Sequence, residues 1–336
     1  MFLSQDGMTV KLLSIMYLRE SAPISAAMMA PVWAVLVLIL LAAGPRSALA
    51  QDNERSTVYL VGSGNVALDQ HMQSLLEKRL GAQRDLLLIS DQQAALTGDA
   101  PIITLGSGAF SRIRQTNRGA PVLALLTEQH FLEGFASRSP GRISGIYHGA
   151  PLLKQALTGK AILPQATRIA LIATTNSAKL YDRLIDQLPA YNLEARLFIV
   201  DDNKQLIPTL IRALSYGDFL LAAPDNDIYN PRTIKHILLT AYRRNRIVIG
   251  PSRAYVKAGV LASGYSPLPA IAEMAGTYLE VFSETGHFPE PDYVPDFRVE
   301  VNQQVARSLN IPLAPPEQIA RTVEARLNDP GGANDE

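Results

Sequence analysis

Two glycine-rich turns stand out among the residues whose types and spacing could do chemistry. The first, residues 61–67 (VGSGNVA), fits G-x-G-x-x-A and lies between an apolar β-rich run and an amphipathic run. With Asp91 after the next apolar run, this is the outline of a dinucleotide-binding turn, in which a pyrophosphate lies on a helix N-terminus. The same glycines would equally bring another small ligand close to a helix N-terminus.

The second turn, residues 105–108 (LGSG), also follows an apolar run. One interpretation is a tight strand-to-helix connection that needs a positive φ. The other is a set of backbone and hydroxyl donors for a ligand carboxylate, because ligands of open α/β sheets lie at the carboxyl ends of the strands. The sequence leaves both interpretations open.

The sequence contains no motif for a metal site, for a serine or cysteine nucleophile, or for nucleic-acid binding. The five histidines are scattered without metal-type spacing, no serine lies in a G-x-S-x-G elbow, and the chain has no cysteine. The 31 basic and 31 acidic side chains balance, so no basic face for nucleic acid is expected. We therefore predict a protein that is not an enzyme, with no catalytic residue, no metal and no cofactor.

An apolar run near the N-terminus indicates export. Residues 32–43 (VWAVLVLILLAA) carry no charge, yet they fall short of the roughly 20 residues that span a bilayer. Ala48 and Ala50 follow in the A-x-A arrangement of a signal-peptidase site. We interpret residues 1–50 as a Sec signal peptide cleaved after Ala50, which predicts a periplasmic protein; a short buried helix or an uncleaved anchor is the alternative. Export also argues against a dinucleotide cofactor.

Strand-like and helix-like runs alternate along the rest of the chain in two series. This alternation predicts an α/β fold with two Rossmann-like lobes, each a parallel sheet flanked by helices. The expected strands are residues 57–61, 86–89, 102–105, 122–126 and 143–147, then 168–173, 194–200, 219–222 and 247–250. The run at 86–89 is continuously apolar, as in a strand buried on both faces.

Several stretches together resemble a known family. Residues 247–261 (IVIGPSRAYVKAGVL), 297–312 (FRVEVNQQVARSLNIP) and 102–109 (IITLGSGA) are similar, in order, to motifs of the ABC-transporter substrate-binding proteins whose better-known members bind tryptophan or tyrosine. The correspondence covers most of residues 57–313.

The resemblance implies a type I periplasmic-binding fold with a three-segment hinge, crossed near residues 147–150, 262–265 and 293–297. The implied lobes are residues 56–147 plus 264–293 and residues 148–263 plus 294–314, followed by a polar tail at 315–336. A small-molecule ligand would lie between the lobes, and the partner would be an ABC permease in the inner membrane. We expect a monomer.

The resemblance also places candidate ligand-binding residues. Hydroxyls and backbone N–H groups would bind a carboxylate, Asp225 an ammonium group, and tyrosines an apolar or aromatic body. For each residue, a role in turn formation or packing remains the alternative. The candidates are Asn65, Gly106, Ser107, Thr127, Tyr147, Thr174, Asn176, Asp225, Asn226, Ser252 and Tyr255.

The chain departs from the family pattern at residues 174–178 and 262–275, which are expected to face the ligand. The fold is therefore better supported than an amino acid or aromatic ligand. The function we predict is that of the periplasmic solute-binding component of an ABC importer. Two alternatives are an orphan binding protein that presents its ligand to a sensor or another envelope protein, and an NAD-type oxidoreductase that uses residues 62–67.

Overall fold

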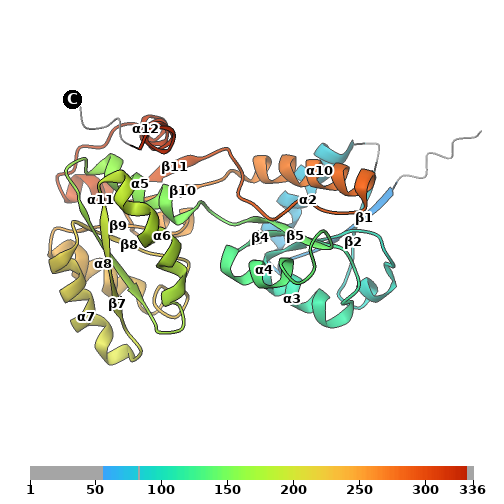
Figure 1. The fold of residues 1–336 in the computed structure, drawn as a ribbon, viewed down its shortest axis with the longest axis horizontal. Helices are drawn as coiled ribbons and strands as arrows, with labels where there is room; N and C mark the ends of the chain where they lie inside the picture. The colour runs from blue at the N-terminus through green and yellow to red at the C-terminus, as the bar shows by residue number, and fades with distance from the viewer. Residues whose placement is uncertain (1–55, 82–83, 331–336) are drawn as a thin grey trace, which may run out of the picture. The chain divides into compact units, whose positions relative to one another are not determined.

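Five apolar runs of the first half form a parallel sheet. The computed structural model describes residues 56–81 and 84–330. Every strand pair in this sheet, called sheet A, is parallel, and the order is β2-β1-β3-β4-β5 (Figure 1). Its strands are β1 (Ser56–Val61), β2 (Arg84–Leu88), β3 (Ile102–Leu105), β4 (Val122–Thr127) and β5 (Ile143–Tyr147).

Helices cover both faces of sheet A. The core on one face joins β1, β3 and β4 to α2 and α10, and the core on the other joins β3 and β4 to α3 and α4. Helix α2 begins where the Asn65 side chain accepts the Leu68 N–H, an N-cap that satisfies one free backbone donor. The helices are α2 (Val66–Leu80), α3 (Gly106–Thr116), α4 (Gln129–Ala136) and α10 (Leu268–Thr285), with the short turn η2 (Gln93–Leu96).

The second half forms sheet B, in the order β11-β10-β9-β8-β6-β7. Its pairs are parallel except that β11 runs antiparallel to β10. The strands are β6 (Arg168–Ala173), β7 (Glu194–Ile199), β8 (Phe219–Leu221), β9 (Ile247–Ile249), β10 (Ala262–Tyr265) and β11 (Arg298–Val301). The helical elements are α5 (Leu152–Ile162), η3 (Ala178–Tyr181), α6 (Asp182–Gln187), η4 (Leu188–Tyr191), α7 (Asn203–Tyr216), α8 (Ile234–Arg243), α9 (Arg253–Lys257), α11 (Gln303–Ser308) and α12 (Pro316–Asn328).

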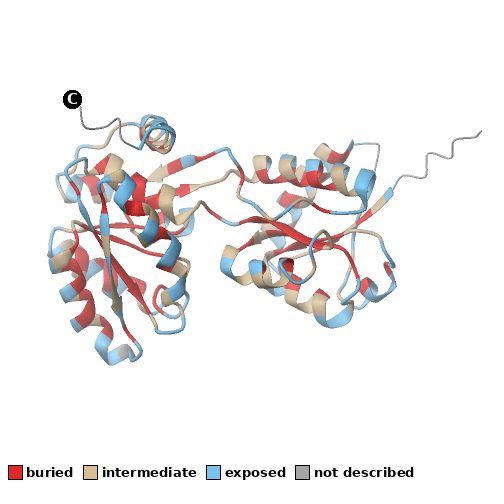
Figure 2. Ribbon diagram, viewed as in Figure 1, coloured by how far each residue is buried: buried red, intermediate tan, exposed pale blue. Residues whose placement is uncertain are grey.

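Each sheet has its own cores, and the inner strands are the most deeply buried elements (Figure 2). We call sheet A with α2, α3, α4 and α10 the first lobe, and sheet B with its helices the second lobe. Because α10 belongs to the first lobe while β10 and β11 belong to the second, the chain passes between the lobes three times. The predicted α/β class with two lobes and a three-segment connection is confirmed.

Three segments differ from the sequence-based expectation. Strand β2 lies at the edge of sheet A, so Leu87 and Leu88 are 48% and 56% exposed rather than buried on both faces. Strand β10 extends to Tyr265 within sheet B, past the boundary predicted at residue 264.

The third difference is at the C-terminus. Residues 316–328, expected in a polar tail, form α12, because Ile319 and Val323, four residues apart, share one helix face and are buried in the core of the second lobe. The predicted signal peptide at 1–50 lies outside the described residues. Among the helices of the described part, none is long and apolar enough to cross a membrane.

Candidate functional site

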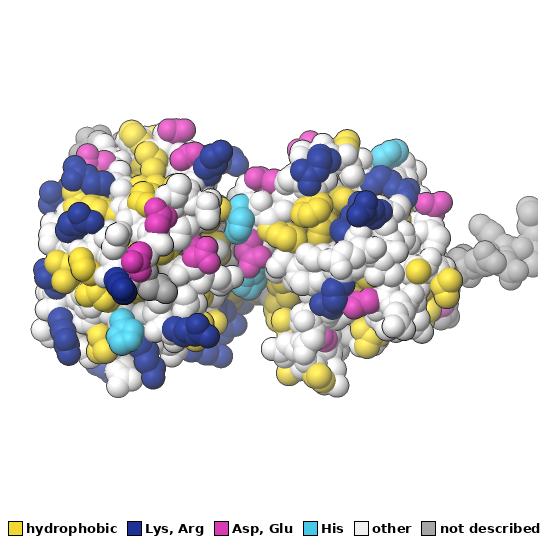
Figure 3. All heavy atoms as spheres, turned by 90° about the horizontal axis from the view of Figure 1, so that it is seen from below, with side chains coloured by type: hydrophobic (Ala, Val, Ile, Leu, Met, Phe, Trp, Pro, Cys, Tyr) yellow, Lys and Arg dark blue, Asp and Glu magenta, His cyan; other side chains and the backbone are white. Residues whose placement is uncertain are grey.

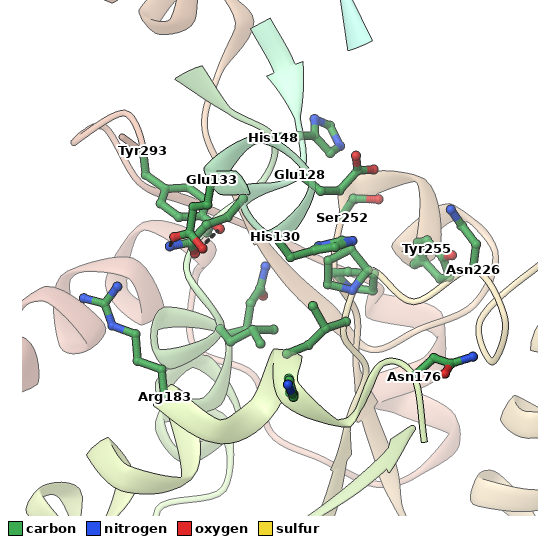
Figure 4. Close-up of a pocket in the computed structure, with 18 residues that line it drawn as sticks. Glu128, His130, Glu133, His148, Asn176, Arg183, Asn226, Ser252, Tyr255 and Tyr293 are labelled. Carbon is green, nitrogen blue, oxygen red and sulfur yellow. Dashed lines mark hydrogen bonds between the residues drawn. The ribbon is translucent and has the colours of Figure 1, made fainter. Parts of the chain in front are cut away.

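A cavity of about 530 Å³ is lined by residues of both lobes (Figure 4). Its walls are formed mainly by the loops and helical turns that follow β4, β5, β6, β8 and β9, that is, by segments at the carboxyl ends of parallel strands. This is the edge at which open α/β sheets bind ligands. The lining residues are Glu128, Gln129, His130, Glu133, His148, Ala150, Leu152, Gln155, Asn176, Lys179, Leu180, Arg183, Pro224, Asn226, Pro251, Ser252, Tyr255 and Tyr293.

The backbone is irregular where β4 reaches this cavity. Leu126 has a φ of +60°, and the register with β5 shifts between Leu125 and Thr127. A positive φ is uncommon for leucine, and such bulges redirect the residues that follow them. Thr127 is fully buried, and Glu128 then becomes the N-cap residue of α4 without a side-chain capping bond. The Glu128 carboxylate is therefore left to line the cavity.

Four charged side chains of the cavity form no ion pair within the described part of the chain. Glu128 and Glu133 come from the first lobe, whereas Lys179 and Arg183 come from the second. Figure 3 shows acidic and histidine side chains together in the hollow of the surface seen from below. The two sides of the cavity thus carry opposite charges, with the first lobe negative and the second lobe positive.

The two glutamates have different surroundings. Glu133 accepts a hydrogen bond from Gln129 Nε2 at 2.6 Å and lies on the same side of the close-up as Arg183 and Tyr293 (Figure 4). Glu128 lies on the other side, near His148 and Ser252. Desolvation lowers the pKa of His148, although the charge of Glu128 acts in the opposite direction, so burial favours the neutral ring.

Asp225, the predicted ammonium ligand, is instead built into its own loop. It is 5% exposed, and its carboxylate accepts the Ser177 hydroxyl and the backbone N–H groups of Asp227 (2.9 Å) and Ile228 (3.4 Å). It lines only a neighbouring cavity of about 360 Å³ among those described. These bonds leave the carboxylate with little capacity for a ligand.

The remaining candidates of the first lobe are dispersed. Asn65 caps α2, and Gly106 opens α3 with a φ of +80°, the positive value expected for a tight connection. Ser107 lines the neighbouring cavity, with its Oγ 3.5 Å from Glu128 Oε2. Thr127 lies behind the wall, where its carbonyl accepts the His148 N–H. Tyr147 is buried against Tyr293, at 4.9 Å between ring centroids.

In the second lobe, four candidates line the main cavity, namely Asn176, Asn226, Ser252 and Tyr255. Tyr255 donates its hydroxyl to the Tyr229 carbonyl at 2.5 Å, which fixes the ring at the wall. Thr174 lines a separate depression beside Asp201 and Asp202, and its hydroxyl is 3.0 Å from that of Ser177.

Sequence reasoning missed most charged residues of the cavity. His148 directly follows the expected strand 143–147, and Glu128 lies two residues after the expected strand 122–126. Polar residues at strand ends are the signal that could identify them. Lys179 and Arg183 are four residues apart, a spacing that places both on one helical face. Tyr293 lies at the third predicted crossing between the lobes, 293–297, but no motif there marks it as a residue of the cavity.

The first glycine turn does not offer free donors to a pyrophosphate. Asp69 fills the turn: its carboxylate accepts the N–H groups of Ser63 (2.8 Å) and Gly64 (3.1 Å), and a Cβ at Gly62 would lie 2.5 Å from its Oδ2. Asp91, which would contact the ribose, is paired with Arg112 at 2.8 Å. An anion already occupies the position of a phosphate, which argues against the dinucleotide alternative.

The sequence matches no protein-family model and no curated protein. Its fold is similar to solved structures. A ligand-free, open substrate-binding protein with adhesive properties from Clostridium difficile has a TM-score of 0.64, with 15% identity over 78% of this chain and 97% of that chain. An ABC domain in complex with L-Trp from Streptococcus pneumoniae has a TM-score of 0.56, with 14% identity over 80% and 98%.

A conserved domain protein from Vibrio cholerae gives a similar result, with a TM-score of 0.55 and 14% identity over 80% of this chain and 98% of that chain. These similarities span nearly the whole of each compared chain, and they agree with the two-lobe topology described above. The chain has the type I periplasmic-binding fold.

Proposed function

We propose that this chain is the solute-binding component of an ABC importer and that it captures a small organic solute in the cavity between its lobes. The observation that carries the proposal is the cavity itself, which is large enough for such a solute and is formed by strand ends of both sheets. A solute that contacts both lobes would stabilise one arrangement of them, which a permease could recognise.

The similar structures support this choice. One is a complex with L-Trp and another is a substrate-binding protein, and both share the fold of this chain. Amino acids and aromatic compounds are therefore the first solutes to test. We further propose the division into lobes at residues 56–147 plus 264–293 and 148–263 plus 294–314, with the second lobe extended to Tyr265 by β10 and beyond residue 314 by α12. We also propose export to the periplasm through residues 1–50.

A thermal-shift screen of residues 51–336 tests the binding proposal. The screen covers amino acids, aromatic acids, amines and sugars. A solute at 100 times its dissociation constant adds roughly 2.7 kcal/mol of stability, which is easily measured. We expect at least one solute to raise the melting temperature in a saturable manner.

A pair of variants shows whether binding occurs in this cavity. Ser252→Trp would fill the cavity, whereas Ser74→Trp adds the same bulk at an exposed position of α2 outside the cavities described. We expect the solute to stabilise the Ser74→Trp protein and not the folded Ser252→Trp protein. Failure of every solute class, or equal binding by both variants, would contradict the proposed function.

A further inference from the structure

The Glu128 carboxylate has few partners of its own. Its one hydrogen bond within the described chain comes from Ser107 Oγ at 3.5 Å, the outer limit of such a bond. It forms no ion pair with a described residue. Although it is the N-cap residue of α4, its side chain does not cap the helix. A partly buried carboxylate without partners is costly, because it loses water without gaining donors.

Glu128 forms no ion pair with Lys179, which also lines the main cavity, and it also lines a second cavity that is more acidic. The neighbouring cavity shares Glu128, His130, Asn176 and Asn226 with the main one, and its wall contains no lysine or arginine. That wall instead adds the carboxylates of Asp225 and Asp227. Glu133 differs, because its end of the cavity contains Arg183.

The chemistry of this end selects against an anion and favours a cation. A carboxylate or phosphate would lie beside three acidic side chains, of which Asp225 is satisfied by its own loop. An ammonium group would supply the donors and the positive charge that Glu128 lacks. The side chains of Asn226 and Ser252, which line the main cavity with Glu128, could accept its other hydrogens.

We propose that Glu128 binds a cationic amine of the solute, so that the solute is an amine or an amino acid rather than an amine-free aromatic acid or a sugar. This inference rests on the proposed function. It moves the ammonium site from the second lobe, where Asp225 was predicted to supply it, to the first lobe.

Matched compounds separate the contribution of the amine from that of the remaining solute. One set is L-tyrosine, tyramine and 3-(4-hydroxyphenyl)propanoate, and the other is L-lysine, cadaverine and hexanoate. Titration calorimetry of the mature protein gives each dissociation constant. In at least one set, we expect the members with an amine to bind at least about tenfold more tightly than the member without one.

The variant Glu128→Gln keeps the size of the side chain and removes its charge. We expect it to weaken amine binding about 10- to 100-fold, the usual effect of a hydrogen bond to a charged group, with little effect on amine-free compounds. Glu284→Gln is the matched control, because Glu284 is exposed on α10 and lines none of the cavities described. Circular dichroism and the unfolding midpoint establish that both variants are folded.

The outcomes distinguish this inference from the proposed function. If a sugar or an amine-free acid binds and Ser252→Trp abolishes its binding, the solute-binding function stands and the amine site is wrong. The amine site is also wrong if Glu128→Gln binds the amine as tightly as the parent protein. If no solute of any class binds, the proposed function is contradicted and the amine site falls with it.

Discussion

The loops that follow β4 and β8 each carry an acidic residue toward the cavities, yet the two residues serve different purposes. In the second lobe, Asp225 satisfies Ser177 and two backbone N–H groups of its own loop. In the first lobe, Glu128 follows a bulge and accepts only one long hydrogen bond from the described part of the chain, from Ser107 Oγ. Residue type and position at a strand end are therefore not sufficient to identify a ligand contact. A side chain at a strand end is free to bind a ligand when its own loop does not occupy it with hydrogen bonds.

The largest expected effect is the loss of Asp225. The Asp225→Ala variant removes a buried acceptor from two backbone N–H groups and the Ser177 hydroxyl, so we expect the free energy of unfolding to fall by about 3 kcal/mol. Urea unfolding followed by circular dichroism measures it. The neighbouring Asp227→Ala variant, at an exposed position, should change it by less than about 0.5 kcal/mol. Equal effects of the two variants would refute the structural role of Asp225.

Asp69 repeats the role of Asp225 in the first lobe, and its loss should have the second largest effect. Its carboxylate accepts the N–H of Ser63, the Ser63 hydroxyl and the N–H of Gly64. Because this turn is only partly buried, water can replace some of these bonds. We expect Asp69→Ala to lower the free energy of unfolding by about 1–2 kcal/mol in the same urea experiment. A value near zero would mean that the turn does not need its carboxylate.

Asp218 is a further acidic residue that accepts backbone hydrogen bonds. It directly precedes β8, at the amino ends of the parallel strands of sheet B. Burial alone would raise the pKa of Asp218, but the N–H groups of Thr167 and Arg168 donate to its carboxylate, and its pKa lies below the ordinary value. The ionised Asp218 carboxylate therefore stabilises the folded state above the ordinary aspartate pKa of about 3.9. This contribution is lost as the pH falls through the lower folded-state pKa.

We expect Asp218→Asn to lower the free energy of unfolding by less than about 1 kcal/mol at pH 7. The difference from the parent protein should shrink as the pH falls through the lowered folded-state pKa, because the parent carboxyl group is then protonated as well. Urea unfolding at a series of pH values measures both. A difference that persists unchanged at pH 2 would show that the charge is not responsible.

The smallest expected effect on stability belongs to Glu128. Because its carboxylate satisfies no backbone donor, Glu128→Gln should change the free energy of unfolding by less than about 0.5 kcal/mol in the absence of solute. A loss comparable to that of Asp225→Ala would mean that Glu128, too, is a structural residue, and the contrast between the two loops would no longer hold.

The alternation of apolar runs was sufficient to predict both sheets, because fully buried parallel strands such as β3 and β6 are continuous apolar stretches. It failed where strands are short and polar: β10 (ASGY) and β11 (RVEV) carry no such signal, and their pairing with each other depends on distant parts of the chain. Helix α12 was missed because only two of its residues, Ile319 and Val323, are fully buried.

The candidate site was harder to predict than the fold. The family resemblance places Asn176, Asn226, Ser252 and Tyr255 at the ligand, and these four residues line the cavity. For Asp225, the sequence predicts a ligand contact. Its hydrogen bond from Ser177, 48 residues earlier in the chain, cannot be read from a local pattern. Glu128 was overlooked for the converse reason, since the lack of internal partners becomes visible only when the neighbouring loops are in place.

A crystal structure with a stabilising solute tests the contrast between Glu128 and Asp225 most directly. We expect the solute in the cavity lined by Glu128, Asn226 and Ser252, with a cationic nitrogen within hydrogen-bond distance of the Glu128 carboxylate. Asp225 should retain its bonds to Ser177, Asp227 and Ile228. A solute whose nitrogen contacts Asp225 instead, or a solute bound outside this cavity, would contradict the assignment.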